Sequence, residues 1–135
     1  MKPVIVSLLA AILLISAPVS AQETKKSGRT VDAKFMLVTG SLVVSTIFDI
    51  ETTFAAIDNP DIPVYEGNPI MRPFINSGRP ATYAFVGMVD AGIVYISYRM
   101  KKSADPDIQK LWWVIPMAAT TGHTLAGGLN LRFVF

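Results

Sequence analysis

Residues 35–57 read FMLVTGSLVVSTIFDIETTFAAI, and this stretch decides the fold class. Residues 35–48 carry no charged side chain, and the first acidic residues of the stretch are Asp49 and Glu51. A helix needs about 20 predominantly apolar residues to cross a bilayer. We therefore expect a membrane-spanning helix over 35–57 that carries Asp49 and Glu51 into or near the membrane.

Two later stretches predict two further spans. Residues 80–100 carry one charged residue before Arg99, which is Asp90 near the middle of the stretch, and they end on an aromatic and basic edge typical of a membrane interface. The third helix is expected to open at Asp105, a cap followed by a proline at the first helical position, and its span covers residues 109–131. The prediction is an all-α membrane protein with three transmembrane helices.

The composition agrees with a membrane location. Hydrophobic residues make up 51% of the chain and charged residues 16%, below the roughly 25% that is usual in soluble domains. The basic residues flank hydrophobic runs, so we interpret them as membrane-edge charges and expect the lipid bilayer, not nucleic acid, as a partner. Because the chain has no cysteine, disulfides, thiolate metal sites and iron–sulfur clusters are excluded.

The N-terminus has the features of a secretory signal peptide. Lys2 precedes an apolar run over 4–15, and the small residues Val19 and Ala21 predict cleavage before Gln22, so that residues 1–21 are removed. The alternative is an uncleaved first membrane helix, since the apolar stretch approaches the minimum spanning length of roughly 17 residues. Residues 22–34 are polar and are expected to form an exposed tail.

The segment between the first two spans, residues 58–80, is rich in proline, which forbids a long regular element. Asn68 and Pro69 fit an N-cap and a first helical position. They predict a short interfacial helix over 69–76 with its apolar side chains against lipid or protein.

Two points of architecture have rival interpretations. A signal peptide together with the terminal residues LRFVF, which are aromatic at alternate positions, would also fit an outer-membrane β-barrel, but the long apolar segments lack the alternation of barrel strands. A cleaved signal peptide places the loop with Lys101 and Lys102 outside the cytoplasm, against the positive-inside tendency, whereas a retained first helix with its N-terminus outside would satisfy it. We expect a multi-pass protein of the bacterial inner membrane with its signal peptide removed.

Polar and small residues recur along one face of each predicted span. Because lipid cannot solvate polar groups, these faces should meet in the bundle. The faces comprise Ser41, Ser45, Asp49, Thr52 and Thr53 in the first span, Gly87, Asp90, Val94 and Ser97 in the second, and Pro116, Thr120, His123, Gly127 and Asn130 in the third, beside a stripe of Ala118, Gly122 and Ala126.

The depth of these residues predicts a polar cluster. Asp49 and His123 lie at similar depth in spans that run in the same direction, so we expect them to share a hydrogen bond. Asp90 should lie about one turn deeper, and Glu51 should snorkel or contact the interfacial helix. An ionisable group inside a membrane is a functional-site hypothesis by default. The candidate cluster is Asp49, Thr52, Thr53, Glu66, Asn68, Asp90, His123, Asn130 and Arg132, the last two at the membrane edge where Glu66 and Asn68 fold back.

The motifs DIETT, with Asp49, Thr52 and Thr53, and EGNP, with Glu66, Asn68 and Pro69, carry a resemblance. The chain resembles a domain-of-unknown-function family of small bacterial and archaeal membrane proteins over about residues 35–131. That family has a helix with an Asp and Thr, an E-x-N-P turn and further hydrophobic spans. The resemblance implies a shared membrane fold and gives weight to these residues, but it implies no activity.

Three classes of function are compatible with the sequence. The leading hypothesis is a non-catalytic membrane component that packs with itself or with other membrane proteins, because three spans leave little room to enclose a substrate. The alternative is a proton- or ion-handling or metal-dependent membrane protein that uses an Asp, His and Glu cluster. An intramembrane hydrolase is third, since the chain has no GxSxG or HExxH motif. We predict no cofactor and no confident metal ligands.

Overall fold

The computed structural model describes residues 30–135, and within that range it is helical and contains no strand. The predicted all-α class is confirmed for these residues. The expected signal peptide, its cleavage site and most of the polar tail lie outside the described range. The elements are α2 (Ala33–Ile57), α3 (Arg72–Asn76), α4 (Arg79–Lys101), α5 (Pro106–Lys110), α6 (Val114–Asn130) and the 3₁₀-helix η1 (Leu131–Phe133).

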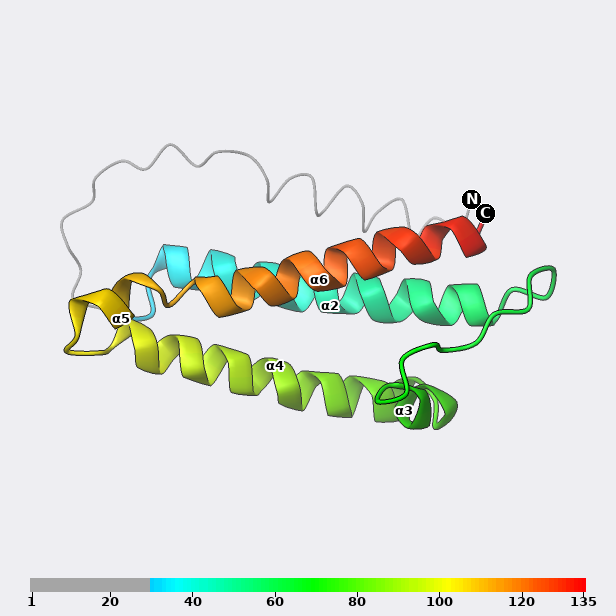
Figure 1. Ribbon diagram of the computed structural model, residues 1–135, viewed down its shortest axis with the longest axis horizontal. Coiled ribbons are helices and arrows are strands. Elements are labelled where there is room, and N and C mark those ends of the chain that lie inside the picture. The colour runs from blue at the N-terminus through cyan, green and yellow to red at the C-terminus, as the bar shows by residue number, and fades with distance from the viewer. Residues whose placement is uncertain (1–29) are drawn as a thin grey trace.

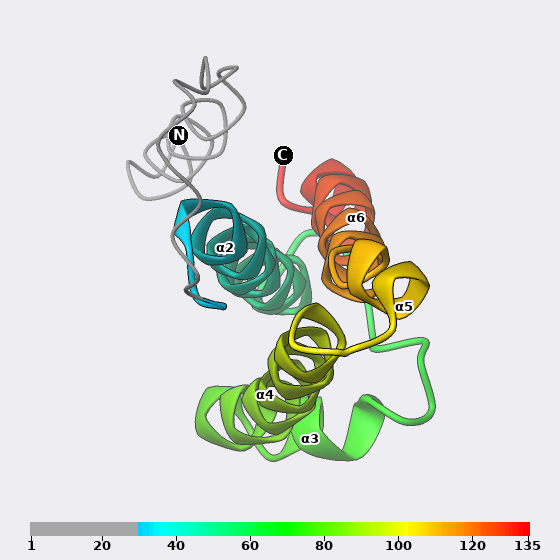
Figure 2. The same cartoon turned by 90° about the vertical axis from the view of Figure 1, so that its left-hand side faces the viewer.

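Three long helices form the bundle. In Figure 1, α2 and α6 run side by side in the same direction and α4 returns in the opposite direction. The view along the bundle places α2, α4 and α6 at the corners of a triangle, with α3 beside the first turns of α4 (Figure 2). Two of these helices, α2 and α4, are long and apolar enough to cross a membrane by length and composition.

Helix α2 begins two residues before its predicted start. The Asp32 side chain accepts a hydrogen bond from the Phe35 N–H at 2.9 Å and so acts as the N-cap. Ala33 and Lys34, which we placed in the exposed tail, belong to the first turn of this helix. The predicted end at Ile57 is confirmed.

The third predicted helix is not continuous, and this is a correction. It is divided into α5 and α6, with turns over residues 111–113. Pro116 has no N–H to donate to the carbonyl oxygen of Trp112, four residues earlier, so a regular helix cannot pass through this point undisturbed. Ser97 of α4 donates its hydroxyl to that oxygen instead, at 2.6 Å. The interruption therefore also ties α4 to the start of α6.

The interfacial helix is shorter than predicted. Residues 69–71 form a turn, and the helix itself covers Arg72–Asn76. The Asn68 side chain accepts from the Ile70 N–H at 3.0 Å, so the expected capping by Asn68 occurs at the turn. Gly78 then links α3 to α4 with a φ of 91°, a left-handed conformation that glycine adopts without a steric penalty.

At the end of the bundle where α3 lies, an apolar core joins three elements. Ile50 and Phe54 of α2 pack with Ile75 of α3 and Val86 of α4. The ring of Phe74 stacks on that of Phe85, with centroids 3.8 Å apart. The short α3 is therefore held against the first half of α4.

Helix α6 lies close against α2 at Gly127. A Cβ atom at this position would lie 2.6 Å from the ring of Phe48 and 3.1 Å from the Cα atom of Asp49. A glycine is needed here because a side chain would push the two backbones apart. This contact places Asp49 directly beside α6.

Candidate functional site

Asp49 and His123 form the centre of the candidate site. The Nδ1 atom of His123 lies 2.8 Å from Oδ2 of Asp49, in the hydrogen-bonded contact that we expected from their depth. The His123 side chain is 24% exposed and the Asp49 side chain 19%, so both are largely buried but still reachable. Gly127, one turn after His123, makes this contact possible because it lets α6 lie against the backbone of Asp49.

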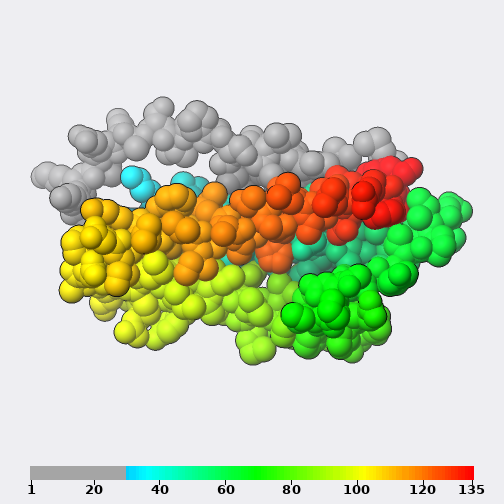
Figure 3. All heavy atoms as spheres, in the orientation of Figure 1, coloured from blue at the N-terminus to red at the C-terminus, as the bar shows by residue number. Residues whose placement is uncertain are grey.

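A pocket of about 370 Å³ opens beside this pair. Asp49 and His123 line it together with Thr53 and Asn130, and Glu66 and Asn68 line it from the connecting segment. Apolar side chains of α3 and α4 complete the wall. In the space-filling view, the surface of α2 is visible between α6 and the green segment that contains α3 (Figure 3). The volume is enough for roughly ten water molecules or a small solute.

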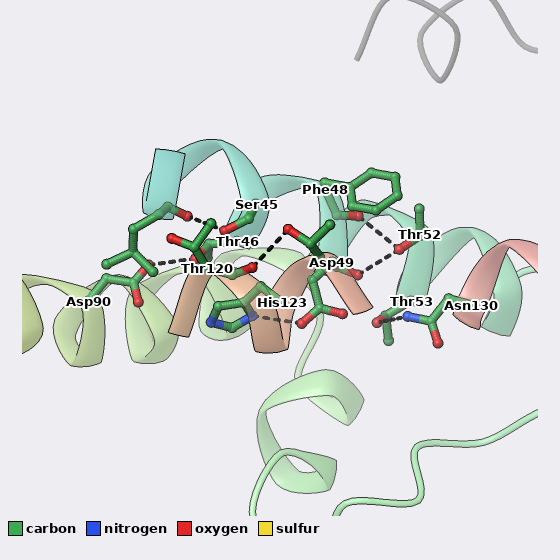
Figure 4. A network of polar contacts seen from close by, with 12 residues as sticks. Ser45, Thr46, Phe48, Asp49, Thr52, Thr53, Asp90, Thr120, His123 and Asn130 are labelled. Carbon is green, nitrogen blue, oxygen red and sulfur yellow. Dashed lines mark hydrogen bonds and ion pairs between the residues drawn. The ribbon is translucent and has the colours of Figure 1, made fainter. Parts of the chain in front are cut away.

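Thr53 and Asn130 fix the side of the pocket nearest the chain end. The Asn130 Nδ2 donates to the Thr53 hydroxyl oxygen at 2.8 Å, one turn of α2 beyond Asp49 (Figure 4). The amide carbonyl of Asn130 and the Thr53 hydroxyl proton remain available to a molecule in the pocket. A smaller pocket of about 250 Å³ adjoins this one, and Thr53, Glu66 and Asn130 line both.

The EGNP segment is held by its own polar groups. Glu66 accepts from the Asn68 N–H at 2.6 Å, and the Nε of Arg72 donates to the Glu66 carbonyl oxygen at 3.0 Å. These contacts hold Glu66 and Asn68 at the pocket, as the sequence predicted for a segment that folds back over the bundle.

Asp90 occupies a separate, deeper position. Its residue is 7% exposed, and its Oδ2 accepts a hydrogen bond from the Thr46 hydroxyl at 2.7 Å. Thr46 was missed by the sequence analysis, which placed the polar face of α2 one residue away. The recurrence of threonine at 39, 46 and 53 was the available signal, because residues seven apart lie on one helical face.

Thr52, Arg132, Gly87 and Glu51 do not line the pocket. Thr52 is buried and donates to the Phe48 carbonyl oxygen of its own helix. The Arg132 guanidinium lies over the ring of Phe133. Gly87 is exposed, so the expected face of α4 is wrong at this position, and Val86 is buried in its place.

Glu51 is the fourth of these residues, and its expected partner was wrong. The Tyr83 hydroxyl donates to Glu51 at 2.8 Å, and the Arg79 Nε lies 3.5 Å from its other carboxylate oxygen. Both partners come from the first turns of α4 and not from α3. The contact adds a polar link between α2 and α4.

The opposite end of the bundle has a cluster of a different kind. The Lys101 ammonium pairs with Asp32 at 2.5 Å and lies over the rings of Trp112 and Phe35, 4.4 and 5.4 Å from their centroids. Burial alone would raise the pKa of Asp32, but the hydrogen bonds from Lys101 and from the Phe35 N–H outweigh it and lower that pKa.

Within residues 30–135, no group of three or more His, Asp or Glu side chains is arranged to hold a metal ion. The pocket offers two carboxylates, an imidazole and two side-chain amides, which suit proton exchange and hydrogen bonding. No protein-family model, curated protein or solved structure matches this chain.

Proposed function

We propose that the chain is a bacterial inner-membrane protein with α2, α4 and α6 as its three spans. The lengths and apolar composition of α2 and α4 support this proposal. Helix α6 has 17 residues, about 26 Å, and η1 continues it, so the two together approach the roughly 30 Å of a hydrocarbon core. The resemblance to the family with the E-x-N-P turn belongs to the same proposal.

The function proposed for this membrane protein is proton handling at the Asp49–His123 pair. The observation that carries the proposal is the 2.8 Å contact between a carboxylate and an imidazole that both line the pocket. Ionisable groups at this depth are costly and are typical of proton relays. Imidazole changes its charge near neutral pH, so it is suited to accept and release a proton there.

Each partner has a defined role. The Asp49 carboxylate accepts the Nδ1–H of His123, which fixes the tautomer and leaves Nε2 as the site that takes up a proton. The carboxylate also stabilises the imidazolium that then forms. Glu66, at the pocket wall, supplies a further carboxylate through which protons reach the pair from the EGNP side.

Proton flux into vesicles that contain the purified protein tests this function. Asp49→Asn and His123→Gln should each lower the flux strongly, since a positioned proton-transfer group typically contributes about 100-fold. Asp61→Asn is the control, because Asp61 is exposed and lies in the segment between helices. Equal flux in all four proteins, or flux no greater than in empty vesicles, would refute proton handling.

The proposed tautomer has an independent readout. His123 is the only histidine of the chain, so histidine-selective ¹⁵N labelling gives one pair of ring signals. We expect the neutral ring to carry its proton on Nδ1 in the unmodified protein and to lose this preference in Asp49→Leu. An Nε2–H tautomer in the unmodified protein would contradict the assigned roles.

A second candidate is the non-catalytic component that packs with itself or with other membrane proteins. Ala118 and Gly122 of α6 are exposed, and small residues allow close helix packing in membranes. Gly122→Leu should then lower the oligomer mass in detergent, whereas Gly92→Leu on α4 should not. A stable oligomer without proton flux would favour this candidate over the first.

A further inference from the structure

Among residues 30–135, Asp90 is the one buried carboxyl group that the proposed proton site does not use. It lies halfway along α4, and Thr46 lies near the middle of α2, so their contact is near the centre of the bundle. Oδ2 of Asp90 accepts from the Thr46 hydroxyl, but Oδ1 is buried and has no hydrogen-bond partner among the described residues. A buried carboxylate with a single neutral donor is poorly compensated.

Within residues 30–135, no Lys or Arg side chain forms an ion pair or a hydrogen bond with Asp90 to balance a negative charge. The titratable groups that face this region from the packed helices are Asp49 of α2 and His123 of α6. Glu51, also on α2, is engaged by Tyr83 and Arg79 nearer the EGNP end. A bound metal ion would need several oxygen ligands, and residues 30–135 hold no group of three acidic or histidine ligands. A proton neutralises the carboxylate without further ligands.

The position of Asp90 relative to the pair gives it access to protons. Figure 4 shows His123 between Asp90 and Asp49 along the bundle, with the Thr46 and Thr120 hydroxyls nearby. Since Nδ1 of this ring faces Asp49, the other ring nitrogen is free to exchange a proton elsewhere.

We propose that Asp90 is a second proton-binding site, protonated at neutral pH, that exchanges its proton with His123. This inference rests on the proposed proton handling at the Asp49–His123 pair. In the transfer, the Nε2–H bond of the imidazolium breaks and an O–H bond forms at Oδ1 of Asp90. One intervening water takes up a proton and gives up another, and the imidazole keeps the Nδ1–H that it donates to Asp49. The path thus runs from the pocket to the centre of the bundle.

Infrared spectroscopy of the full-length protein in lipid bilayers tests the site directly, because a protonated carboxyl group has a carbonyl band that a carboxylate lacks. We expect this band at neutral pH in the unmodified protein, in Asp49→Asn and in the exposed control Asp61→Asn, and its loss in Asp90→Asn. Thr46→Val should shift the band, since it removes the hydrogen bond to Oδ2. Absence of the band, or its survival in Asp90→Asn, would overturn the proposal.

Two further measurements separate the possible failures. If Asp90 is ionised and the carboxylate bands respond when sodium chloride replaces choline chloride, the site binds a metal cation and the proton proposal is wrong. In vesicles, Asp90→Asn should lower proton flux at least about tenfold, while the Nδ1–H tautomer of His123 is retained. Flux that needs Asp49 and His123 but is unchanged in Asp90→Asn would reject this inference alone. An Asp90 band without any flux would reject the proposed function and leave the protonated site standing.

Discussion

The two ends of the bundle differ in how they are filled. At one end, the closed end, Lys101 pairs with Asp32 and lies over the rings of Phe35 and Trp112, while the Ser97 hydroxyl donates to the Trp112 carbonyl oxygen just before α6. At the other end, α3 and the EGNP segment lie against the helices and leave a pocket of about 370 Å³.

The two ends therefore differ in access. Aromatic rings and a paired ammonium group fill the closed end, so the relative positions of α2, α4 and α6 are fixed there. The open end, which contains Asp49, His123, Glu66 and Asn130, has polar groups around a space that water or a solute can enter. Proton exchange needs such access, and at this end the helices are held together beside the pocket, by the apolar core of Ile50, Phe54, Ile75 and Val86 and by the close approach at Gly127.

The largest expected effect is at the contact that aligns α6 with α2. Gly127→Ala introduces a Cβ atom 2.6 Å from the Phe48 ring and 3.1 Å from the Asp49 backbone, so it should destabilise the bundle by up to about 3 kcal/mol. Thermal unfolding in detergent measures the change. Gly128→Ala is the matched control, because its Cβ atom meets nothing within 4 Å and should be neutral or slightly stabilising. Equal melting temperatures for both variants would disprove the close approach.

The second largest effect is expected for Ser97→Ala at the closed end. The substitution leaves the Trp112 carbonyl oxygen without the hydroxyl that now donates to it, at a cost of about 1–2 kcal/mol in the free energy of unfolding. The interrupted segment between α5 and α6 should also exchange its amide protons faster. Ser41→Ala is the control, since that hydroxyl bonds only to a carbonyl of its own helix. An unchanged melting temperature in Ser97→Ala would show that this link is dispensable.

A double-mutant cycle on Asp49 and His123 should give a smaller effect at the open end. Asp49→Leu and His123→Leu each strand the partner, so the double variant should be less destabilised than the sum of the two single variants. Hydrogen bonds between membrane helices average about 0.6 kcal/mol, and we expect a coupling of this size or somewhat larger. Strict additivity would mean that the two side chains do not stabilise one another.

The smallest effect concerns pH and the closed end. The folded pKa of Asp32 is lowered, so its stabilising charge is present above the unfolded value near 3.8 and is lost as the pH falls through the folded value. Because the Asp32 side chain is 39% exposed, solvent screening should limit the loss to less than about 0.5 kcal/mol. Asp32→Asn keeps a side chain suited to capping but should flatten the stability curve below pH 4. A steeper acid transition in Asp32→Asn would show that the charge of Asp32 does not stabilise the folded protein.

Much of the fold was predictable from local pattern. The starts and ends of α2 and α4 fall within two residues of the predicted spans, because apolar runs and the basic residues at 99–102 mark them in the sequence. The interruption before α6 was not predicted. Pro116 was visible, but whether a proline bends, ends or divides a helix depends on what satisfies the freed carbonyl, and here the donor is Ser97 of another helix.

For the candidate site, helical periodicity and depth were sufficient to bring Asp49 and His123 together. The same reasoning failed for Gly87 and overlooked Thr46, because a helix can rotate by one residue to place a neighbouring position in the bundle. Periodicity identifies a face to within about 100° per residue, which is too coarse to choose between adjacent side chains.

The sequence by itself determined the helical class, the approximate extent of α2 and α4 and the depth of each polar residue, since these follow from local hydropathy and a fixed rise per residue. Only the tertiary structure decided which groups are paired. Asp49 has an imidazole and a pocket, whereas Asp90 has a single hydroxyl and a buried oxygen without a partner among the described residues. The physical reason is that hydrogen bonding between helices depends on their relative rotation and separation, which Gly127 and the closed end set together.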